Sequence, residues 1–291
     1  MNIFDNLRLT YKNGNTLIKL IYLNVAVFLL INIFLVIFRL FNIDASEYIN
    51  WLAVPSNLNR LLGHFWTPLT YMFLHKGFYH ILFNMLMLFW FGRLFLTYFS
   101  EKQLLSLYIL GGLIAASVYV IAYNVFPYYS AAAYYSVLLG ASGSIMAIVV
   151  ATAVRAPNAE MNLLLIGRVK LIYIAIITVL ISVFSLTGNN GGGEMAHLGG
   201  ALTGYLFAVT YKKGTDITYF ITRIVDFFVN LFRPRPKQKA PKFHSQRMSP
   251  QEYNQQKARN EAEIDRILDK IKTSGYESLS ADEKRKLFEK K

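Results

Sequence analysis

The sequence predicts an all-α membrane protein, in which a bundle of six transmembrane helices is followed by a soluble helical tail. The 291 residues are 54% hydrophobic and only 16% charged, and the mean hydropathy is +0.35. A soluble domain carries roughly 25% charged residues. The charge is also uneven, because residues 214–291 hold 17 of the 30 Lys and Arg residues and 11 of the 17 Asp and Glu residues. These observations indicate an apolar body with a charged tail.

Six apolar stretches are long enough to be transmembrane helices. Each has 17 to 24 residues, and about 20 residues cross the hydrocarbon core of a bilayer. The last three are short, which a bundle tolerates where the bilayer thins or water reaches the helix ends. The six stretches are Leu17–Leu40, His80–Phe99, Leu104–Phe126, Val137–Val154, Val169–Leu186 and Met195–Tyr211.

The Lys and Arg residues near the ends of these stretches predict the orientation, because cytoplasmic segments carry more positive charge. One side of the predicted bundle carries nine of them, and the opposite side carries Arg39, Arg60 and Lys76. Both termini are therefore predicted to be cytoplasmic. The nine are Arg8, Lys12, Lys19, Lys102, Arg155, Arg168, Lys170, Lys212 and Lys213.

The remaining segments predict interfacial and soluble pieces. Residues 41–76 mix Trp and Leu with polar residues, which is typical either of an amphipathic segment at the outer interface or of a surface loop. Asp216–Phe232 has one apolar face and is predicted to lie in the interface, with a seventh span as the alternative. A basic linker follows at 233–242. The predicted organisation is a membrane domain over 1–213, an interfacial helix and linker over 214–249, and a helical hairpin over 250–291.

Four polar residues lie within or at the ends of the predicted spans: His80, Asn84, Ser142 and His197. Polar groups in a bilayer are costly and often mark a functional site. Each of them alone is more typical of helix packing or interhelical hydrogen bonding than of a functional site. Each of the three spans concerned begins on the outer side, so all four residues are predicted at similar depth. Polar residues with purely structural roles could lie at different depths in the membrane. The shared depth of these four residues therefore favours a functional site.

The residues around Ser142 and His197 suit a nucleophile and a base. Glycine at Gly140 and Gly143 allows a tight turn and a close substrate approach. The backbone N–H groups at the start of a helix lack partners and can bind a developing negative charge. Small residues after Ser142, and Gly200 and Gly204 after His197, allow two helices to pack closely. Metal-thiolate and disulfide chemistry is excluded, because the chain has no cysteine.

With these motifs the sequence resembles the rhomboid intramembrane serine proteases, in particular the bacterial six-span type. The matching features are His80-x-x-x-Asn84, then Gly140-x-Ser142-Gly143, and then Ala196-His197-x-x-Gly200-x-x-x-Gly204. A single G-x-S-G motif is weak support, but three motifs in the family's order and spacing, each in the expected helix, are specific. The resemblance covers roughly residues 15–213.

The resemblance implies an endopeptidase with a Ser142–His197 dyad, no third acidic member and an acyl-enzyme intermediate. Asn84, His80 and the backbone N–H of Ser142 would bind the oxyanion, and Gly140, Gly143, Gly200 and Gly204 would support the site. The implied partners are single-span transmembrane substrates and the lipid bilayer, with no metal, cofactor or nucleic acid. The implied location is a bacterial inner membrane.

Two positions depart from the family pattern. Thr67 follows Trp66 where many members have arginine, and Met146 stands where bacterial relatives often have a tyrosine that stacks on the catalytic imidazole. Three other functions were weighed. A catalytically silent relative typically lacks the nucleophile or the base, a channel or transporter predicts more charged residues in the spans, and a soluble hydrolase requires a further glycine and a strand before the serine.

Overall fold

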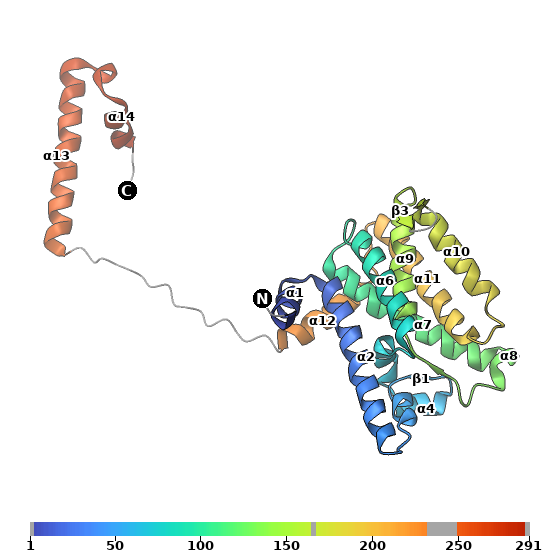
Figure 1. The fold of residues 1–291 in the computed structure, drawn as a ribbon. Coiled ribbons are helices and arrows are strands. Elements are labelled where there is room, and N and C mark those ends of the chain that lie inside the picture. The colour runs from blue at the N-terminus through green and yellow to red at the C-terminus, as the bar shows by residue number, and fades with distance from the viewer. Residues whose placement is uncertain (1–2, 164–166, 232–248, 289–291) are drawn as a thin grey trace. The chain divides into compact units, whose positions relative to one another are not determined.

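The computed structural model describes residues 3–163, 167–231 and 249–288, and these residues are mainly helical (Figure 1). They form two compact units, one of which ends with helix α12 while the other contains α13 and α14. The longer helices of the first unit are α1 (Ile3–Asn13), α2 (Thr16–Leu40), α6 (Phe78–Phe95), α7 (Glu101–Val125), α9 (Ser142–Arg155), α10 (Leu171–Phe184), α11 (Gly191–Lys212) and α12 (Tyr219–Leu231).

The all-α class is confirmed, and a helix occupies each of the six predicted stretches. Among the described residues, three helices are long and apolar enough to cross a membrane by length and composition: α2, α6 and α7. Helices α9 and α10 are apolar but have only 14 residues each. The helix predicted to begin at Val137 begins instead at Ser142, because Val137–Leu138 forms strand β2. Helix α1 was not predicted.

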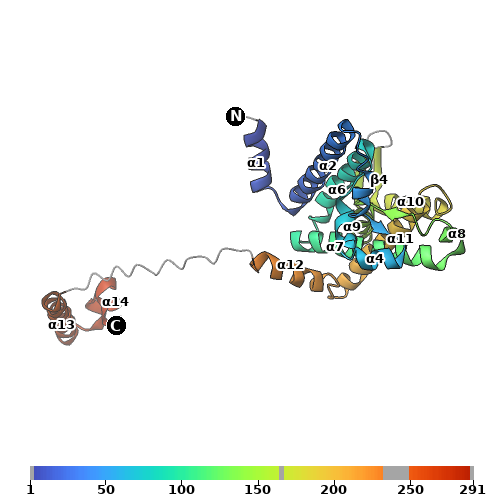
Figure 2. The same ribbon diagram turned by 90° about the horizontal axis from the view of Figure 1, so that it is seen from below.

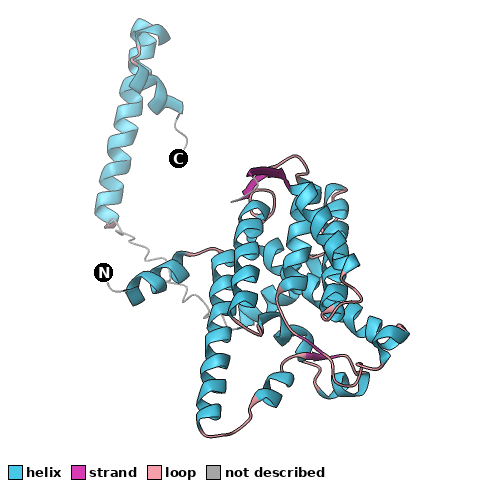
Figure 3. Ribbon diagram, turned by 45° about the vertical axis from the view of Figure 1, so that its right-hand side comes forward, coloured by secondary structure: helices cyan, strands magenta, loops and turns pink. Residues whose placement is uncertain are grey.

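The segment between α2 and α6 consists of short elements that pack onto the helices. They are α3 (Ser46–Asn50), β1 (Val54–Pro55), α4 (Leu58–Gly63), α5 (Thr67–Thr70) and η1 (Tyr71–Phe73). Strand β1 pairs antiparallel with β2, so that Val54 lies opposite Leu138. This pairing joins the segment to the chain just before α9. A second antiparallel pair, β3 (Glu160–Leu163) with β4 (Gly167–Lys170), connects α9 to α10 (Figure 3).

Helix α9 lies at the centre of the bundle and packs against α6, α7, α10 and α11. Every residue from Gly143 to Ala153 is buried. Small residues permit this close packing, since a methyl group added to Gly111 of α7 would lie 2.6 Å from the Ala147 side chain. The start of α9 is therefore held by protein contacts on several sides.

Helix α12 packs against α7 through polar side chains (Figure 2). Lys102 Nζ lies 2.7 Å from an Asp226 carboxylate oxygen, and the Ser106 and Thr222 hydroxyl groups are 2.8 Å apart. Helix α12 is not among the helices long and apolar enough to span a membrane in the described part of the chain. It belongs to the same compact unit as the bundle. Its predicted position at the membrane interface stays a prediction, as do the domain boundaries at 213 and 249.

The second unit is a helical hairpin made of α13 (Pro250–Ser274), η2 (Tyr276–Ser278) and α14 (Ala281–Phe288). Ser249 and Glu252 form a capping box at the start of α13, and Gly275, with φ 77°, ends that helix. The basic linker predicted at 233–242 lies outside the described residues.

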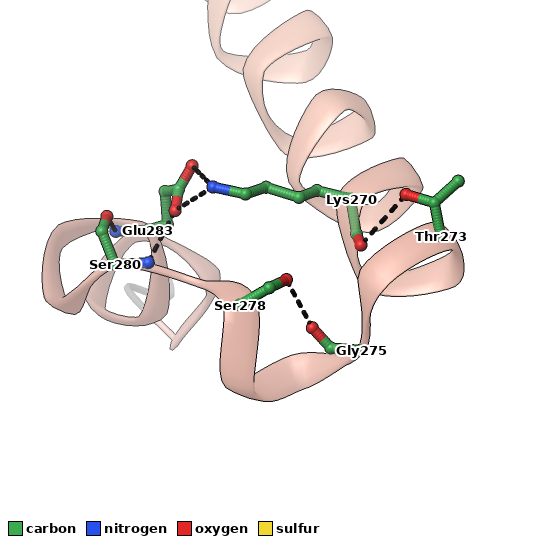
Figure 4. A network of polar contacts seen from close by, with 6 residues as sticks. All are labelled: Lys270, Thr273, Gly275, Ser278, Ser280 and Glu283. Atoms are coloured by element: carbon green, nitrogen blue, oxygen red, sulfur yellow. Dashed lines mark hydrogen bonds and ion pairs between the residues drawn. The ribbon is translucent and has the colours of Figure 1, made fainter.

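A polar network connects the two helices of this hairpin (Figure 4). The backbone N–H of Ser280 donates to Glu283 Oε2 at 2.7 Å, and Lys270 Nζ donates to both carboxylate oxygens of Glu283 at 3.0 Å. The Ser280 N–H first and the Lys270 ammonium second lower the pKa of Glu283 from 4.5 to about 2. Glu283 thus accepts hydrogen bonds from both helices, and protonation of its carboxylate would weaken these contacts only in strong acid.

Candidate active site

A cavity of about 850 Å³ opens between α6, α9 and α11, and it is lined by all four polar residues identified in the sequence. His80 and Asn84 come from α6, Ser142 from the first turn of α9, and His197 from α11. Side chains separated by up to 117 positions along the chain thus face one space. A concave site with a few convergent polar groups is the usual setting of a binding or catalytic centre.

Ser142 is the first residue of α9, and its side chain is partly exposed to the cavity. The chain reaches it through Gly140, whose φ of +131° favours glycine. A methyl group at Gly140 would lie 3.1 Å from His80 Nε2 and 3.7 Å from Ser142 Oγ, which places both atoms around the same glycine. Ser144, two residues later, is fully buried and does not line the cavity. Only Ser142 of these two serines is accessible to a substrate.

The backbone at the start of α9 is free to bind negative charge. No side chain caps this helix, and its first recorded backbone hydrogen bond is from Ile145 N to Ala141 O at 2.9 Å. The N–H groups of the first turn have no partner within the helix. Together with the helix dipole, they favour an anion near Ser142.

The backbones of α9 and α11 are in direct contact next to Ser142 and His197. A methyl group at Gly143 would lie 3.5 Å from the carbonyl oxygen of Ala196, the residue before His197. One at Gly200 would overlap the Gly143 carbonyl, and one at Gly204 would overlap the Ala147 carbonyl. Three of the four predicted supporting glycines, Gly143, Gly200 and Gly204, therefore lie at the contact between the two helices.

His80 and Asn84 share one face of α6, as the four-residue spacing predicts. The backbone N–H of Lys76 donates to His80 Nδ1 at 3.3 Å, so the neutral ring carries its proton on Nε2, the nitrogen nearest Gly140. The Asn84 amide donates one hydrogen bond to the His80 carbonyl at 2.8 Å. An amide nitrogen has a second N–H, which remains available to the cavity.

An acidic side chain contacts His197, although the resemblance implies a dyad without one. Glu194 Oε2 lies 3.0 Å from His197 Nδ1, and Ser182 Oγ of α10 lies 3.3 Å from the same nitrogen. This contact was not predicted, because the predicted last span begins at Met195 whereas α11 begins at Gly191. The three-residue spacing of an acid and a histidine on one helix was the available signal.

The two departures from the family pattern occupy buried positions. Met146 is 8% exposed and lines the cavity, where a thioether can pack against a ring. Thr67 is fully buried, and its hydroxyl donates to the His64 carbonyl at 2.8 Å. Thr67 therefore makes a local structural contact in the segment before α6.

The geometry provides a partly exposed hydroxyl, an imidazole held by a carboxylate, and several N–H donors around one cavity. These are the parts that acyl transfer requires, namely a nucleophile, a proton acceptor and an oxyanion site. In the described part of the chain no group of three or more His, Cys, Asp or Glu residues could hold a metal ion.

Comparison with known proteins gives two family matches. The model of the Rhomboid domain matches residues 62–214, more than half of the chain, and this range contains all four cavity residues. The model of a family of unknown function, DUF6576, matches residues 250–290, which include α13 and α14. No curated protein matches the sequence.

Proposed function

The chain belongs to the rhomboid family, and from this membership we propose that it is an intramembrane serine endopeptidase with Ser142 as nucleophile and His197 as general base. Family membership and the apolar helices indicate an integral membrane protein of a serine protease family. The observation that carries the finer assignment is the single cavity lined by Ser142, His197, His80 and Asn84.

In the proposed reaction, the Ser142 hydroxyl attacks the carbonyl carbon of the scissile peptide bond while His197 accepts the hydroxyl proton. His197 then gives this proton to the leaving amine, and an acyl-enzyme ester remains on Ser142. Water, activated by the same imidazole, hydrolyses the ester and restores the serine. The packing of Gly143 against Ala196 supports this pairing, because it keeps the two helices in contact next to both residues.

The oxyanion of each tetrahedral intermediate would be bound by the Ser142 backbone N–H, His80 Nε2–H and the free N–H of Asn84. Such donors act strongly because they are oriented before the charge develops. The positions of His80 Nε2 near Gly140 and of Asn84 on the cavity wall support this role.

Replacing Asn84 with alanine is expected to lower kcat by roughly 10²- to 10³-fold, as for the loss of one oxyanion donor. Labelling by a fluorophosphonate should persist at a reduced rate, because the nucleophile and the base remain. The measurement is single-turnover cleavage of a membrane substrate in liposomes. An unchanged kcat would remove Asn84 from the oxyanion site.

We also propose that all six helices cross the membrane with both termini cytoplasmic, in a bacterial inner membrane. Helix α9 is about 21 Å long at 1.5 Å per residue, shorter than ~30 Å of hydrocarbon. Its buried surface explains how it can be so short, since protein rather than lipid surrounds it. The site would then lie below the outer surface.

The absence of cysteine makes this orientation directly testable. A single cysteine introduced at Asn13 or Ser280 should be blocked by a membrane-impermeant thiol reagent only after intact cells are permeabilised. A cysteine introduced at Tyr134, in the segment before β2, should react in intact cells. The opposite pattern would reverse the proposed topology.

The proposed substrates are single-span membrane proteins whose helices unwind near small or helix-breaking residues. The test compares the parent chain with Ser142→Ala and His197→Ala in a liposome cleavage assay, together with fluorophosphonate labelling. Only the parent is expected to cleave and to be labelled efficiently. Undiminished labelling of His197→Ala would contradict its role as the base.

A further inference from the structure

The carboxylate of Glu194 is held on the side of His197 that carries Nδ1. The distance between His197 Nδ1 and Glu194 Oε2 is 3.0 Å. The Glu194 side chain is only 15% exposed and the His197 side chain 22%. Ser182 Oγ lies 3.3 Å from the same Nδ1 atom. The carboxylate and the Ser182 hydroxyl thus contact the imidazole on one side.

This contact determines which nitrogen of His197 carries the proton. An ionised carboxylate can only accept hydrogen bonds, so Nδ1 is the donor and, in the neutral ring, Nε2 is left as the basic nitrogen. His197 and Ser142 line the same cavity, and an unprotonated Nε2 facing this cavity is needed to accept the serine proton. The negative charge also stabilises the imidazolium that forms during the reaction.

We propose that Glu194 is a positioning residue that fixes the tautomer and orientation of His197, so that the chain works with a Ser142–His197–Glu194 triad. The inference rests on the proposed function, because it requires His197 to act as the base. Ser182 Oγ contacts His197 Nδ1 at 3.3 Å and Ser182 is 2% exposed, so this side of the imidazole is shielded from water.

A purely structural role for Glu194 makes different predictions. An acidic residue in the first turn of a helix is stabilising through the helix dipole alone, and Glu101 is such a residue in α7, where it accepts hydrogen bonds from Thr16. Loss of that role would lower thermal stability and leave the pH dependence of the reaction unchanged. Glu101→Gln is therefore the matched control for Glu194→Gln.

The charged and titratable groups around His197 are few. Its own helix contributes Glu194. The other elements around the cavity contribute His80, Lys76, Tyr79, Tyr119, Tyr123 and Tyr135. The described residues that line the cavity include no Asp or Glu. Glu194 is thus the carboxylate whose removal should be visible in the pH profile.

The experiment measures kcat, KM and the pH–rate profile of the full chain in liposomes for the parent, Glu194→Gln and Glu101→Gln. We expect Glu194→Gln to lower kcat by about 10²-fold, less than the roughly 10⁴ caused by loss of a fully buried triad acid, with KM nearly unchanged. The acid limb of its profile should move to lower pH, because imidazolium has lost a neighbouring negative charge. Glu101→Gln should keep the parental profile.

An unchanged kcat and an unchanged acid limb in Glu194→Gln would overturn the inference, as would an equal loss in both variants accompanied by equal loss of thermal stability. Cleavage by Ser142→Ala at the parental rate would instead overturn the proposed function. Ser182→Ala provides a second measure if Glu194→Gln fails to fold. Ser182→Ala should also lower kcat, but by a smaller factor. A parental kcat in that variant would contradict the proposed role of Ser182 beside His197.

Discussion

Replacing Ser142 with alanine is expected to abolish peptide cleavage, with kcat falling by roughly 10⁶-fold as in other serine proteases that lose the nucleophile. The reason is chemical, since the acyl-enzyme cannot form without the Oγ atom. The residual rate would come from binding and the oxyanion donors alone. The measurement is cleavage of a membrane substrate in liposomes, with labelling by a fluorophosphonate as a second readout.

Ser144→Ala is the matched control, because Ser144 belongs to the same helical turn. Its hydroxyl is buried without a recorded hydrogen-bond partner and does not line the cavity. Removing this oxygen should leave both labelling and cleavage near the parental level. Cleavage that persists in Ser142→Ala, or that disappears equally in both variants, would contradict the assignment of the nucleophile.

Replacing Gly200 with alanine is expected to reduce both stability and activity. The added methyl group would overlap the Gly143 carbonyl, and backbone cannot move aside as a flexible side chain can. Overpacking of this kind costs about 1–3 kcal/mol. The helices must separate to relieve it, which displaces His197 from Ser142. Even 1 Å of displacement can cost about 10²-fold in rate, so we expect kcat to fall at least that far.

The measurements are thermal unfolding in detergent and kcat in liposomes. Gly63→Ala is the control, because a methyl group there would meet no atom within 4 Å. It should match the parent in both assays. A Gly200→Ala variant with parental stability and kcat would show that α9 and α11 can adjust without moving the site, contrary to the packing described.

The sequence predicted the six main helices of the bundle and four polar residues that line the cavity, for identifiable physical reasons. Long apolar stretches reveal helices, and polar residues such as His80 and Asn84 stand out because a bilayer makes them costly. The start of α9 was predicted less accurately. Val137–Leu138 has the apolar composition of a span, but its pairing with Val54–Pro55 depends on residues more than 80 positions away. Local patterns carry no information on such a pairing.

The contact of Glu194 with His197 was missed for a different reason. The predicted sixth span begins at Met195, which leaves GGGE outside the helix, and glycine has low helix propensity. In the structure, Gly191 begins α11, and the three glycines fit against nearby side chains. A methyl group at Gly192 would lie 2.7 Å from the Tyr123 ring. The need for close packing overrides propensity here and places Glu194 one turn before His197.

The burial of α9 by other helices limits how the surrounding lipid can influence the site. The residues from Gly143 to Ala153 are buried by other helices, so acyl chains have almost no direct access to the helix that begins with Ser142. Changes in lipid composition or bilayer thickness act first on exposed helices such as α2 and α10, whose apolar side chains face outward. Lipids can therefore act on the part of α9 that follows Ser142 only by shifting the helices around it.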